Sequence, residues 1–337
     1  MVNPYHVAFN ATDRSYLAIL KREIHLLVGQ LKFSTKRAGE IDIIVAEMGS
    51  NLVKHAGGGE ILVRILKEPE PEGIELISID NGPGMADPGR MMTDGVSTSQ
   101  TLGHGLGAIK RLSDVFNLYS TPEWGTVLLA RIFKKPPARG ALNPRAEVRS
   151  VIVPKPGETV SGDGFSSQLS TETLRLFLGD GLGHGPEAGE AVRQAAVSFQ
   201  ESRETQPVEI IRQMHRAVRK TRGLVGTVAA FDFSTRKCRL CGVGNITTRF
   251  HLGPHSRNYL SYNGIIGLNV PGTMNDQELT FESGHVMIMC SDGIKSRWDI
   301  SRYPSILKYD LSVLAAALYK DYARRTDDTS VVIARFS

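Results

Sequence analysis

The sequence predicts a two-domain α+β protein, and three observations support this fold class. The chain has 337 residues, about the length of two ordinary domains that each bury their own core. Residues 135–146 include three prolines and show no apolar periodicity, as expected of a linker. Residues 1–134 begin with helical patterns, whereas residues 147–337 are dominated by strand patterns. We therefore expect domains at 1–134 and 147–337, joined by a linker at 135–146.

Residue patterns define the expected elements of both parts. Apolar residues recur at helical spacing near the start of the chain, and Ser34 or Thr35 can cap a second helix. The first part is expected to contain helices at 12–31, 35–55 and 105–114 and strands at 60–67, 73–80, 115–120 and 125–133. The second part is expected to contain strands at 147–153, 173–178, 227–233, 237–243, 247–251, 286–290 and 329–336 and helices near 186–202, 207–220 and 311–324.

The composition is that of an ordinary globular protein. Apolar residues make up 41% of the chain and charged residues 22%. The formal net charge of +5 is spread along the chain rather than gathered in a basic run, so no nucleic-acid partner is expected. No apolar run approaches the ~20 residues that cross a bilayer, and the three cysteines form no disulfide framework. We therefore expect a cytoplasmic protein without a membrane partner.

Three short motifs in the first part suggest a nucleotide pocket. Glu47 and Asn51 stand on one face of the expected second helix. Asp80 ends a strand and is followed by a glycine turn through Gly84, and a glycine-rich stretch at 103–107 opens the short helix. Glycines let backbone N–H groups approach phosphates, and a helix N-terminus favours their negative charge. An asparagine oxygen suits Mg²⁺, and a nearby carboxylate can activate a nucleophile.

In this order and at this spacing, the motifs resemble the GHKL fold, the ATP-binding fold shared by gyrase, histidine kinases and MutL. The closest resemblance is to the anti-sigma-factor serine kinases, including the stressosome type, and it covers residues 7–133. It implies a GHKL-type α/β sandwich that binds ATP with Mg²⁺, with a lid at residues 91–102. It also implies that Glu47 is the catalytic base and that Asn51 ligates Mg²⁺. The implied nucleotide-binding residues are Asn51, Asp80, Gly84, Gly103, His104, Gly105, Leu106, Gly107 and Thr126.

Four aspartates in the second part suggest a metal site. Asp163, Asp180 and Asp292 are each followed directly by glycine, and Asp327 precedes the last expected strand. A single Asp-Gly pair is an ordinary turn, but four aspartates at the edges of apolar strands favour a shared site. Carboxylate and carbonyl oxygens suit Mg²⁺ or Mn²⁺. Two such ions can activate a water and hold a phosphoryl group for in-line attack.

This set of residues resembles the SpoIIE-like branch of the PPM metal-dependent serine/threonine phosphatases, over residues 147–337. The resemblance implies a PPM-type αββα sandwich that holds two Mn²⁺ or Mg²⁺ ions. The implied metal-binding residues are Asp163, acting through a water, Asp180, Gly181 through its carbonyl, Asp292 and Asp327. Asp328 is the alternative to Asp327, because the position is ambiguous by one residue. Animal-type PPM members carry a proton-donating histidine where this chain has Leu182; His184, two residues further on, fits either a proton donor or a turn residue.

The two resemblances together imply a bifunctional bacterial partner-switching regulator. The first domain would phosphorylate a serine or threonine of a STAS-type anti-sigma antagonist, in a stressosome-like complex. The second domain would remove phosphate from the same or a related antagonist. Two alternatives stay open: a phosphatase regulated by ATP without kinase chemistry, and a module that switches a partner by nucleotide-dependent binding alone. Where ATP controls the phosphatase, the lid and the linker are the expected gating elements.

Overall fold

The computed structural model describes residues 5–67, 70–91, 105–135, 145–253 and 255–337. The chain forms two compact units that do not follow the order of the sequence. The first unit contains His6–Ala141 together with Tyr303–Lys320, and the second contains Leu142–Arg302 and Asp321–Ser337. The segment Tyr303–Lys320, called the inserted segment below, lies in the stretch that the sequence pattern assigns to the second domain. The reason for this difference lies in its buried contacts with the first unit.

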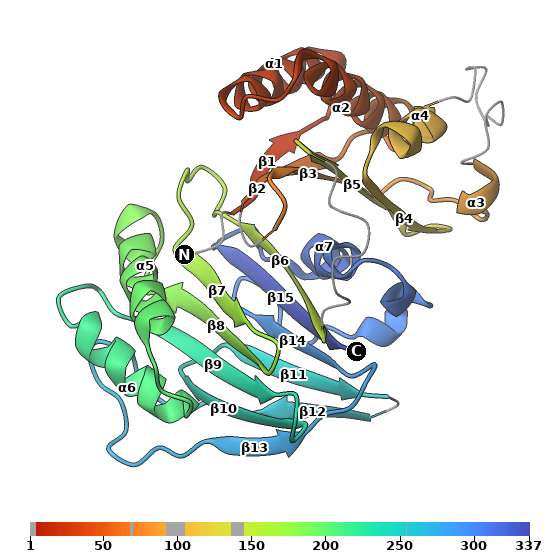
Figure 1. Cartoon of the computed structure of the whole chain (residues 1–337). Coiled ribbons are helices and arrows are strands. Elements are labelled where there is room, and N and C mark those ends of the chain that lie inside the picture. The colour runs from red at the N-terminus through yellow and green to blue at the C-terminus, as the bar shows by residue number, and fades with distance from the viewer. Residues whose placement is uncertain (1–4, 68–69, 92–104, 136–144, 254) are drawn as a thin grey trace. The chain divides into compact units, whose positions relative to one another are not determined.

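The first unit is built on a five-stranded antiparallel sheet of order β1-β2-β3-β5-β4 (Figure 1). Its strands are β1 (Val7–Asn10), β2 (Glu60–Leu66), β3 (Gly73–Asp80), β4 (Val115–Thr121) and β5 (Gly125–Phe133). Its helices are α1 (Arg14–Gln30), α2 (Thr35–His55), α3 (Pro88–Met91), α4 (Gly105–Leu112) and α7 (Leu311–Tyr322), whose last two residues belong to the second unit. Ser34 caps α2 by accepting a hydrogen bond from the backbone N–H of Arg37, which confirms the predicted helix start.

Both faces of this sheet are buried. On one face, Ile61, Ile74 and Ile132 form a core with the apolar sides of α1 and α2. Strand side chains alternate between faces, so neighbouring residues such as Glu75 and Arg131 point to the opposite face, where they are also buried. There they meet the inserted segment, which contains the 3-10 helix η2 (Ile306–Lys308) and most of α7.

The second unit contains two five-stranded sheets (Figure 1). The first has the order β13-β10-β9-β8-β7 and the second the order β12-β11-β14-β15-β6. The strands of the first sheet are β7 (Asp163–Leu169), β8 (Thr173–Gly181), β9 (Leu224–Asp232), β10 (Lys237–Val243) and β13 (Gln277–Thr280). The strands of the second are β6 (Ala146–Val153), β11 (Thr247–Leu252), β12 (His255–Tyr259), β14 (Val286–Cys290) and β15 (Thr329–Phe336). The unit's helices are α5 (Pro186–Glu201), α6 (Pro207–Ala217) and the 3-10 helix η1 (Ile300–Arg302).

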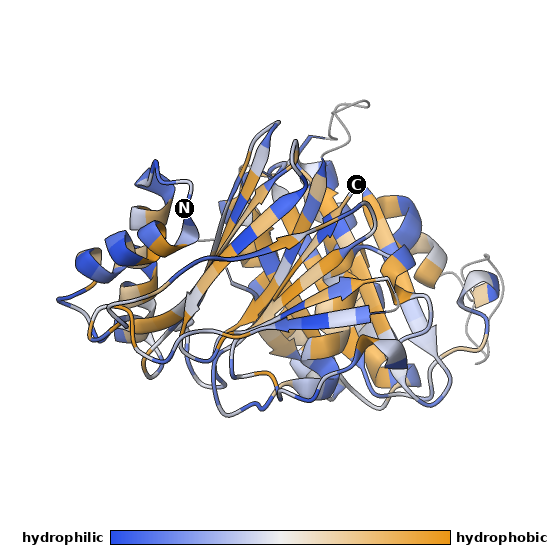
Figure 2. Ribbon diagram, turned by 90° about the horizontal axis from the view of Figure 1, so that it is seen from below, coloured by the Kyte–Doolittle hydropathy of each residue, from blue (hydrophilic) through white to orange (hydrophobic). Residues whose placement is uncertain are grey.

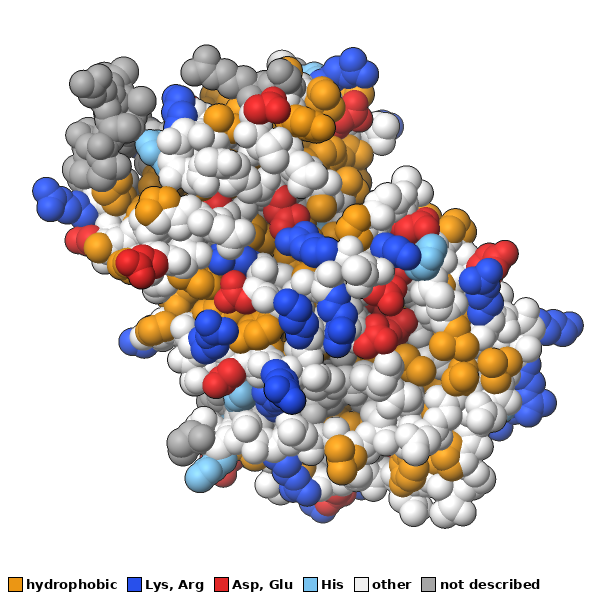
Figure 3. All heavy atoms as spheres, turned by 180° about the vertical axis from the view of Figure 1, so that it is seen from behind, with side chains coloured by type: hydrophobic (Ala, Val, Ile, Leu, Met, Phe, Trp, Pro, Cys, Tyr) orange, Lys and Arg blue, Asp and Glu red, His pale blue; other side chains and the backbone are white. Residues whose placement is uncertain are grey.

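Two apolar cores hold these layers together. Phe231 and Phe336 belong to the core between the sheets, and Phe199 and Val228 to the core between α5, α6 and the first sheet. Cys238 and Cys241 lie in different cores, as expected for residues three apart on a strand. Hydrophobic residues concentrate along the strands (Figure 2), and on the face drawn in Figure 3 basic side chains are interspersed with acidic ones. None of the described helices is long and apolar enough to cross a membrane.

The two-domain α+β fold class is confirmed, and most predicted elements are present. The short elements β1, β7, β12, β13 and α3 were not predicted. β6 begins at Ala146, the last residue of the expected linker, and residues 136–144 of that linker lie outside the described residues.

Candidate functional site

Asp80 and Thr126 face each other at the end of the sheet in the first unit. They are register partners on β3 and β5, and Asp80 Oδ1 accepts the backbone N–H of Thr126 at 3.1 Å. The same oxygen accepts the backbone N–H of Gly82 at 2.8 Å. Burial raises the pKa of Asp80, and these hydrogen bonds partly offset the effect. The carboxylate is therefore held in one orientation beside a glycine turn.

That turn depends on Gly84. Its φ is +70°, and a Cβ atom there would lie 1.9 Å from the carbonyl oxygen of Thr121. A larger residue would push the turn away from the β4–β5 connection. The predicted adenine-side residues Asp80, Gly84 and Thr126 therefore lie close together.

Glu47 and Asn51 meet the start of α4 at Gly105. A Cβ atom on Gly105 would lie 2.6 Å from Glu47 Oε2 and 3.7 Å from Asn51 Oδ1. A side chain at position 105 would require the Glu47 carboxylate to move, so Gly105 leaves Glu47 and Asn51 room at the helix start. In the same helix Gly107 is buried, and Leu106 packs against the core of the first unit. The expected residues Gly103 and His104, and the expected lid apart from Met91, lie outside the described residues.

In the second unit, Asp163 and Asp180 lie directly opposite each other on the antiparallel strands β7 and β8. Asp163 is buried, and its Oδ2 accepts a hydrogen bond from Ser291 Oγ at 2.7 Å. Ser291 follows β14, and its Oγ also accepts the backbone N–H of Ser330 in β15 at 2.9 Å. Ser291, at the end of the second sheet, therefore connects that sheet to Asp163 in the first sheet.

Asp292 comes directly after Ser291 and is exposed. Its Oδ2 accepts a hydrogen bond from Asn245 Nδ2 at 2.9 Å, and its backbone carbonyl accepts one from Arg324 Nε at 2.8 Å. Asn245 and Ser291 were not predicted as site residues. Ser291 directly precedes Asp292, and Asn245 directly follows Gly244.

Asp327 and Asp328 have different environments. Asp328 is buried, and its two oxygens accept the backbone N–H groups of Lys155 and Gly162, each at 2.9 Å. Asp327 is half-buried, and its Oδ1 accepts only a local hydrogen bond, from the backbone N–H of Asp328 at 3.0 Å. Asp328 thus binds protein backbone, whereas Asp327 is better placed to bind a ligand.

The aspartates raise one another's pKa. For Asp180 the largest cause is burial, followed by the charges of Asp163, Asp292 and Asp327. Burial also raises the pKa of Asp163, and the hydrogen bond from Ser291 only partly opposes it. The cluster therefore holds several carboxylates whose mutual repulsion a divalent cation would relieve.

The donor chemistry of this cluster fits Mg²⁺ or Mn²⁺, because all the side-chain donors are carboxylate oxygens. In the described part of the chain, no group of three or more His, Cys, Asp or Glu side chains is arranged to hold a metal ion as it stands. Asp163 and Asp292 each bind a neighbouring side chain instead. The cluster therefore fits a divalent cation in its type of donor atom and in its negative charge, but not in its present side-chain arrangement.

His184 does not lie free in the turn after β8. Its Nδ1 lies 2.7 Å from Glu158 Oε1, and both side chains are partly exposed. This contact favours the turn role for His184 over the proton-donor role.

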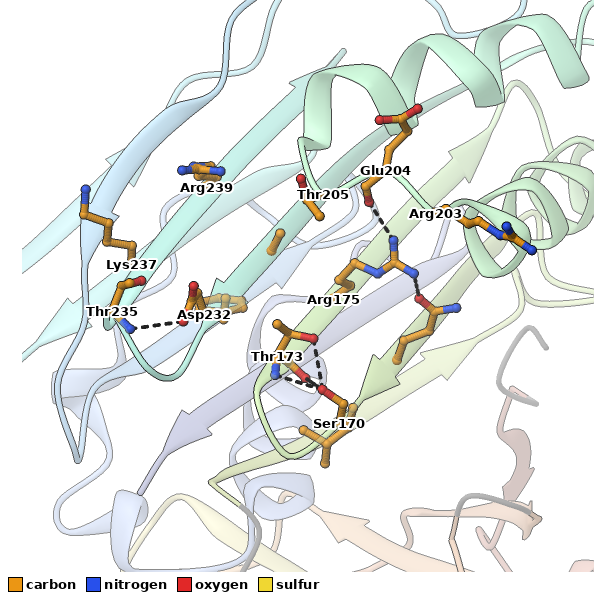
Figure 4. A pocket seen from close by; sticks show the side chains of 14 residues that line it. Ser170, Thr173, Arg175, Arg203, Glu204, Thr205, Asp232, Thr235, Lys237 and Arg239 are labelled. Carbon is orange, nitrogen blue, oxygen red and sulfur yellow. Dashed lines mark hydrogen bonds between the residues drawn. The ribbon is translucent and has the colours of Figure 1, made fainter.

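A cavity of about 390 Å³ lies at the opposite end of β7 and β8 from the aspartates (Figure 4). Several cationic side chains line it, and three of them have protein partners. Arg175 donates to the carbonyls of Ser202 and Glu204. Lys237 and Arg239 both pair with Glu278. We therefore assign this cavity no ligand.

A curated relative identifies the first unit. Residues 9–132 match the family model of the histidine kinase-like ATPase domain. The serine/threonine-protein kinase RsbT of Bacillus subtilis (strain 168) is 37% identical over 101 residues, which are 30% of this chain and 76% of RsbT. The chain belongs to the RsbT family of serine/threonine kinases. The nucleotide-side geometry around Asp80 and Gly105 lies within the matched domain.

This RsbT-family chain carries a second catalytic domain. Residues 170–337 match the family model of stage II sporulation protein E (SpoIIE). The phosphoserine phosphatase RsbX of Bacillus subtilis (strain 168) is 26% identical over 188 residues, covering 54% of this chain and 91% of RsbX. The second domain is therefore a serine/threonine phosphatase domain of the SpoIIE type, a class that uses metal, and the first is an ATP-using serine kinase domain. Together they make the chain a regulator of the partner-switching kind.

Solved structures agree with this assignment. A structure described as "The bacterial stressosome: a modular system that has been adapted to control secondary messenger signaling" is 29% identical, with a TM-score of 0.54 over 56% of this chain and 99% of that chain. A crystal structure of RsbX with magnesium is 22% identical, with a TM-score of 0.52 over 58% of this chain and 98% of that chain, and it supports the fold.

Proposed function

We propose that the chain is a bifunctional partner-switching enzyme. Its kinase domain transfers the γ-phosphate of ATP to a serine or threonine of a STAS-type anti-sigma antagonist. Its phosphatase domain removes phosphate from the same or a related antagonist. The observation that carries this proposal is that one chain holds two separate sets of reactive groups. Glu47 and Asn51 meet Gly105 in one unit, and Asp163 faces Asp180 in the other.

On the kinase side, the side chains have distinct roles. Asn51 holds Mg²⁺, and Glu47 acts as the base that accepts the proton of the attacking hydroxyl. Asp80 accepts a hydrogen bond from the adenine amino group. The two backbone N–H groups bind its Oδ1, so Oδ2 is the oxygen that we assign to adenine. The glycines of residues 103–107 cradle the phosphates, and Thr126 and Gly84 complete the adenine side.

On the phosphatase side, Asp180, the carbonyl of Gly181, Asp292 and Asp327 hold two Mn²⁺ or Mg²⁺ ions, and Asp163 supports a water ligand. When bound, such ions activate a water and stabilise the phosphoryl group. Asp328 has a structural role, because its oxygens bind backbone N–H groups. Ser291 and Asn245 orient Asp163 and Asp292.

The two relatives support a protein partner that is phosphorylated on serine or threonine. RsbT is named a serine/threonine-protein kinase and RsbX a phosphoserine phosphatase, and this chain combines a domain similar to each. We propose that its partner is a STAS-domain protein in the cytoplasm, in a complex of stressosome type.

The test uses the full chain and STAS proteins encoded beside its gene. With γ-labelled ATP and Mg²⁺, wild type should label a STAS protein, and Glu47→Gln should not. With the phosphorylated STAS protein and Mn²⁺, wild type should release phosphate, and Asp180→Asn should not. Phosphatase activity without any labelling would favour the ATP-regulated phosphatase. Nucleotide-dependent STAS binding without either reaction would favour the binding module.

A further inference from the structure

The inserted segment is an unusual part of the first unit, because the chain on either side of it belongs to the second unit. Its helix α7 is buried on every side from Leu311 to Tyr319. A helix that is apolar and buried all round lies inside a fold rather than on its surface. The segment clusters by its contacts with the unit that carries the nucleotide pocket.

The start of α7 is fixed to β5 through Arg131. Its guanidinium donates to both oxygens of Asp310, at 2.6 and 2.9 Å, and to Ser312 Oγ at 2.7 Å. The same guanidinium donates to Glu75 Oε2 at 2.6 Å. A two-pronged Arg–carboxylate contact fixes orientation as well as distance.

The end of the segment lies against the adenine side of the pocket. Lys320 Nζ is 4.1 Å from the ring centroid of Trp124, in the β4–β5 turn. The charge of Lys320 also acts on the carboxyl of Asp80. The backbone N–H of Glu123 in this turn donates to the carbonyl of Pro83, beside Gly84. The β4–β5 turn therefore links Lys320 to the glycine turn beside Asp80.

The two ends of the segment lead to the two candidate metal ligands that flank it. Asp292 lies between β14 and the segment, and Asp327 lies between the segment and β15. The two connecting stretches are joined to each other within the second unit. The backbone N–H of Arg324 donates to the carbonyl of Gly293 at 2.8 Å, and its Nε donates to the carbonyl of Asp292. Ile294 and Ala323 add a β-bridge. These stretches, 291–296 and 322–328, are called the stems below.

We propose that Asp310, Tyr319 and Lys320 are positioning residues that couple the nucleotide pocket to the phosphatase metal site. Nucleotide binding beside Asp80 restrains the end of α7 at Lys320, and the stems pass this restraint to Asp292 and Asp327. Tyr319 contributes through its hydroxyl, which donates to Glu60 Oε2 at 3.1 Å. Packed elements shift between discrete arrangements rather than deforming continuously, so a local change reaches the stems. An ordered set of ligands binds metal more tightly, because less order is lost on binding.

This inference rests on the proposed metal-binding role of the aspartates and adds its regulation. The expected gating elements were the lid and the linker, most of which lie outside the described residues. The inserted segment supplies a different and direct route between the two sites.

The first experiment is hydrogen–deuterium exchange on the full chain, with and without a non-hydrolysable ATP analogue and Mg²⁺. The analogue should slow exchange around Asp80, in α7 and in both stems. In Lys320→Gln and in Asp310→Asn, protection around Asp80 should remain and protection of the stems should disappear. Lys308→Gln is the matched control, because Lys308 is exposed in the same segment. It should behave as wild type.

The second experiment measures phosphatase rate against buffered free Mn²⁺, with and without the analogue. In wild type the analogue should lower the Mn²⁺ concentration for half-maximal rate by about fivefold, the low end of ordinary allosteric coupling. Lys320→Gln should keep its rate without nucleotide and lose this shift, whereas a purely structural defect would lower the rate in both states. Asp310→Asn serves as the second variant and should give the same result.

The outcomes separate this inference from the proposed function. If the phosphatase is active but the analogue changes neither its Mn²⁺ dependence nor hydrogen exchange in the stems, the coupling is overturned. This result does not overturn the proposed phosphatase activity. Loss of the shift in Lys308→Gln overturns the assignment to Lys320. A chain with no metal-dependent activity overturns the proposed phosphatase. In that case protection of the stems by the analogue still supports the coupling, and protection confined to the nucleotide pocket overturns it.

Discussion

Arg131 and Asp310 form a two-pronged ion pair between residues that are 179 positions apart in the chain. Arg131 lies near the end of β5, and Asp310 directly precedes α7. Both side chains are largely buried, and Glu75 is the second anionic partner of the guanidinium. The pair attaches the inserted segment to the sheet of the kinase domain.

Breaking this pair should destabilise the first unit strongly. Asp310→Ala leaves a buried guanidinium with one partner fewer, and such losses typically cost about 3–5 kcal/mol. Urea unfolding of the full chain, followed by a signal from the first unit, measures the change. The control is Lys134→Gln, which removes the more exposed pair with Glu72 and should change stability by less than about 1 kcal/mol. Equal effects in the two variants would show that the inserted segment is only loosely attached.

The stability of the first unit should fall at acidic pH because of Glu75. Burial alone would raise its pKa, but Arg64 and Arg131 outweigh this effect and hold the pKa well below its usual range. A depressed folded pKa means that the unfolded chain takes up the proton first. Ionised Glu75 therefore stabilises the fold above about pH 4.3, and this contribution is lost as the pH falls below that value.

The matched measurement is the unfolding free energy of wild type and Glu75→Gln at several pH values. The variant should be less stable near neutral pH, and the difference should shrink as the pH falls below about 4.3. A constant difference over the whole range would mean that Glu75 is not the group responsible.

Substitutions of Asn51 and Glu47 should impair different steps. Asn51→Ala should abolish binding of Mg-ATP, because Asn51 links the ion to the protein. Glu47→Gln should keep binding and lose transfer by about 100-fold or more, since a base acts only in the reaction. Calorimetry with a non-hydrolysable analogue and a phosphotransfer assay separate the two. An equal loss of affinity in both variants would contradict these roles.

Substitutions of Asp327 and Asp328 should also have different effects. Asp327→Ala should remove metal-dependent phosphatase activity with little change in stability. Asp328→Ala should lower stability by about 1–3 kcal/mol for each lost buried hydrogen bond to Lys155 and Gly162. Thermal unfolding and p-nitrophenyl phosphate turnover, with an EDTA control, measure both. The reverse pattern would make Asp328 the ligand.

The sequence predicted the fold class because its signals are local. Helical spacing, the Ser34 cap and the glycine turns each involve neighbouring residues, and most helices and strands follow from them. The sequence also contains a sign that both faces of the sheet formed by β2, β3 and β5 are buried. β2 and β5 contain runs of consecutive apolar residues, Ile61–Val63 and Val127–Ala130, instead of strict alternation, which indicates strands that are covered on both faces. The identity of the cover could not be predicted, because it depends on contacts between residues far apart in the chain.

The candidate sites also contain some features that the sequence predicts and others that depend on the fold. The motifs located Asp80, Gly105 and the aspartates, since each stands at the end of an element. The roles of Ser291 and Asn245 depend on which strand ends meet, and the difference between Asp327 and Asp328 depends on which backbone groups lie opposite. Neither can be read from spacing alone.

The most direct test of the central claim is catalytic release of inorganic phosphate from ATP in the presence of a small amount of the STAS partner. A chain with both activities should phosphorylate and dephosphorylate the partner repeatedly, and release many equivalents of phosphate for each partner molecule. Glu47→Gln should neither phosphorylate the partner nor release phosphate. Asp180→Asn should transfer one equivalent of phosphate to each phosphorylation site of the partner and release none. A mixture of the two variants should restore release. If wild type releases no more phosphate than Asp180→Asn, or if release continues without the partner, the chain does not combine the two activities on one partner.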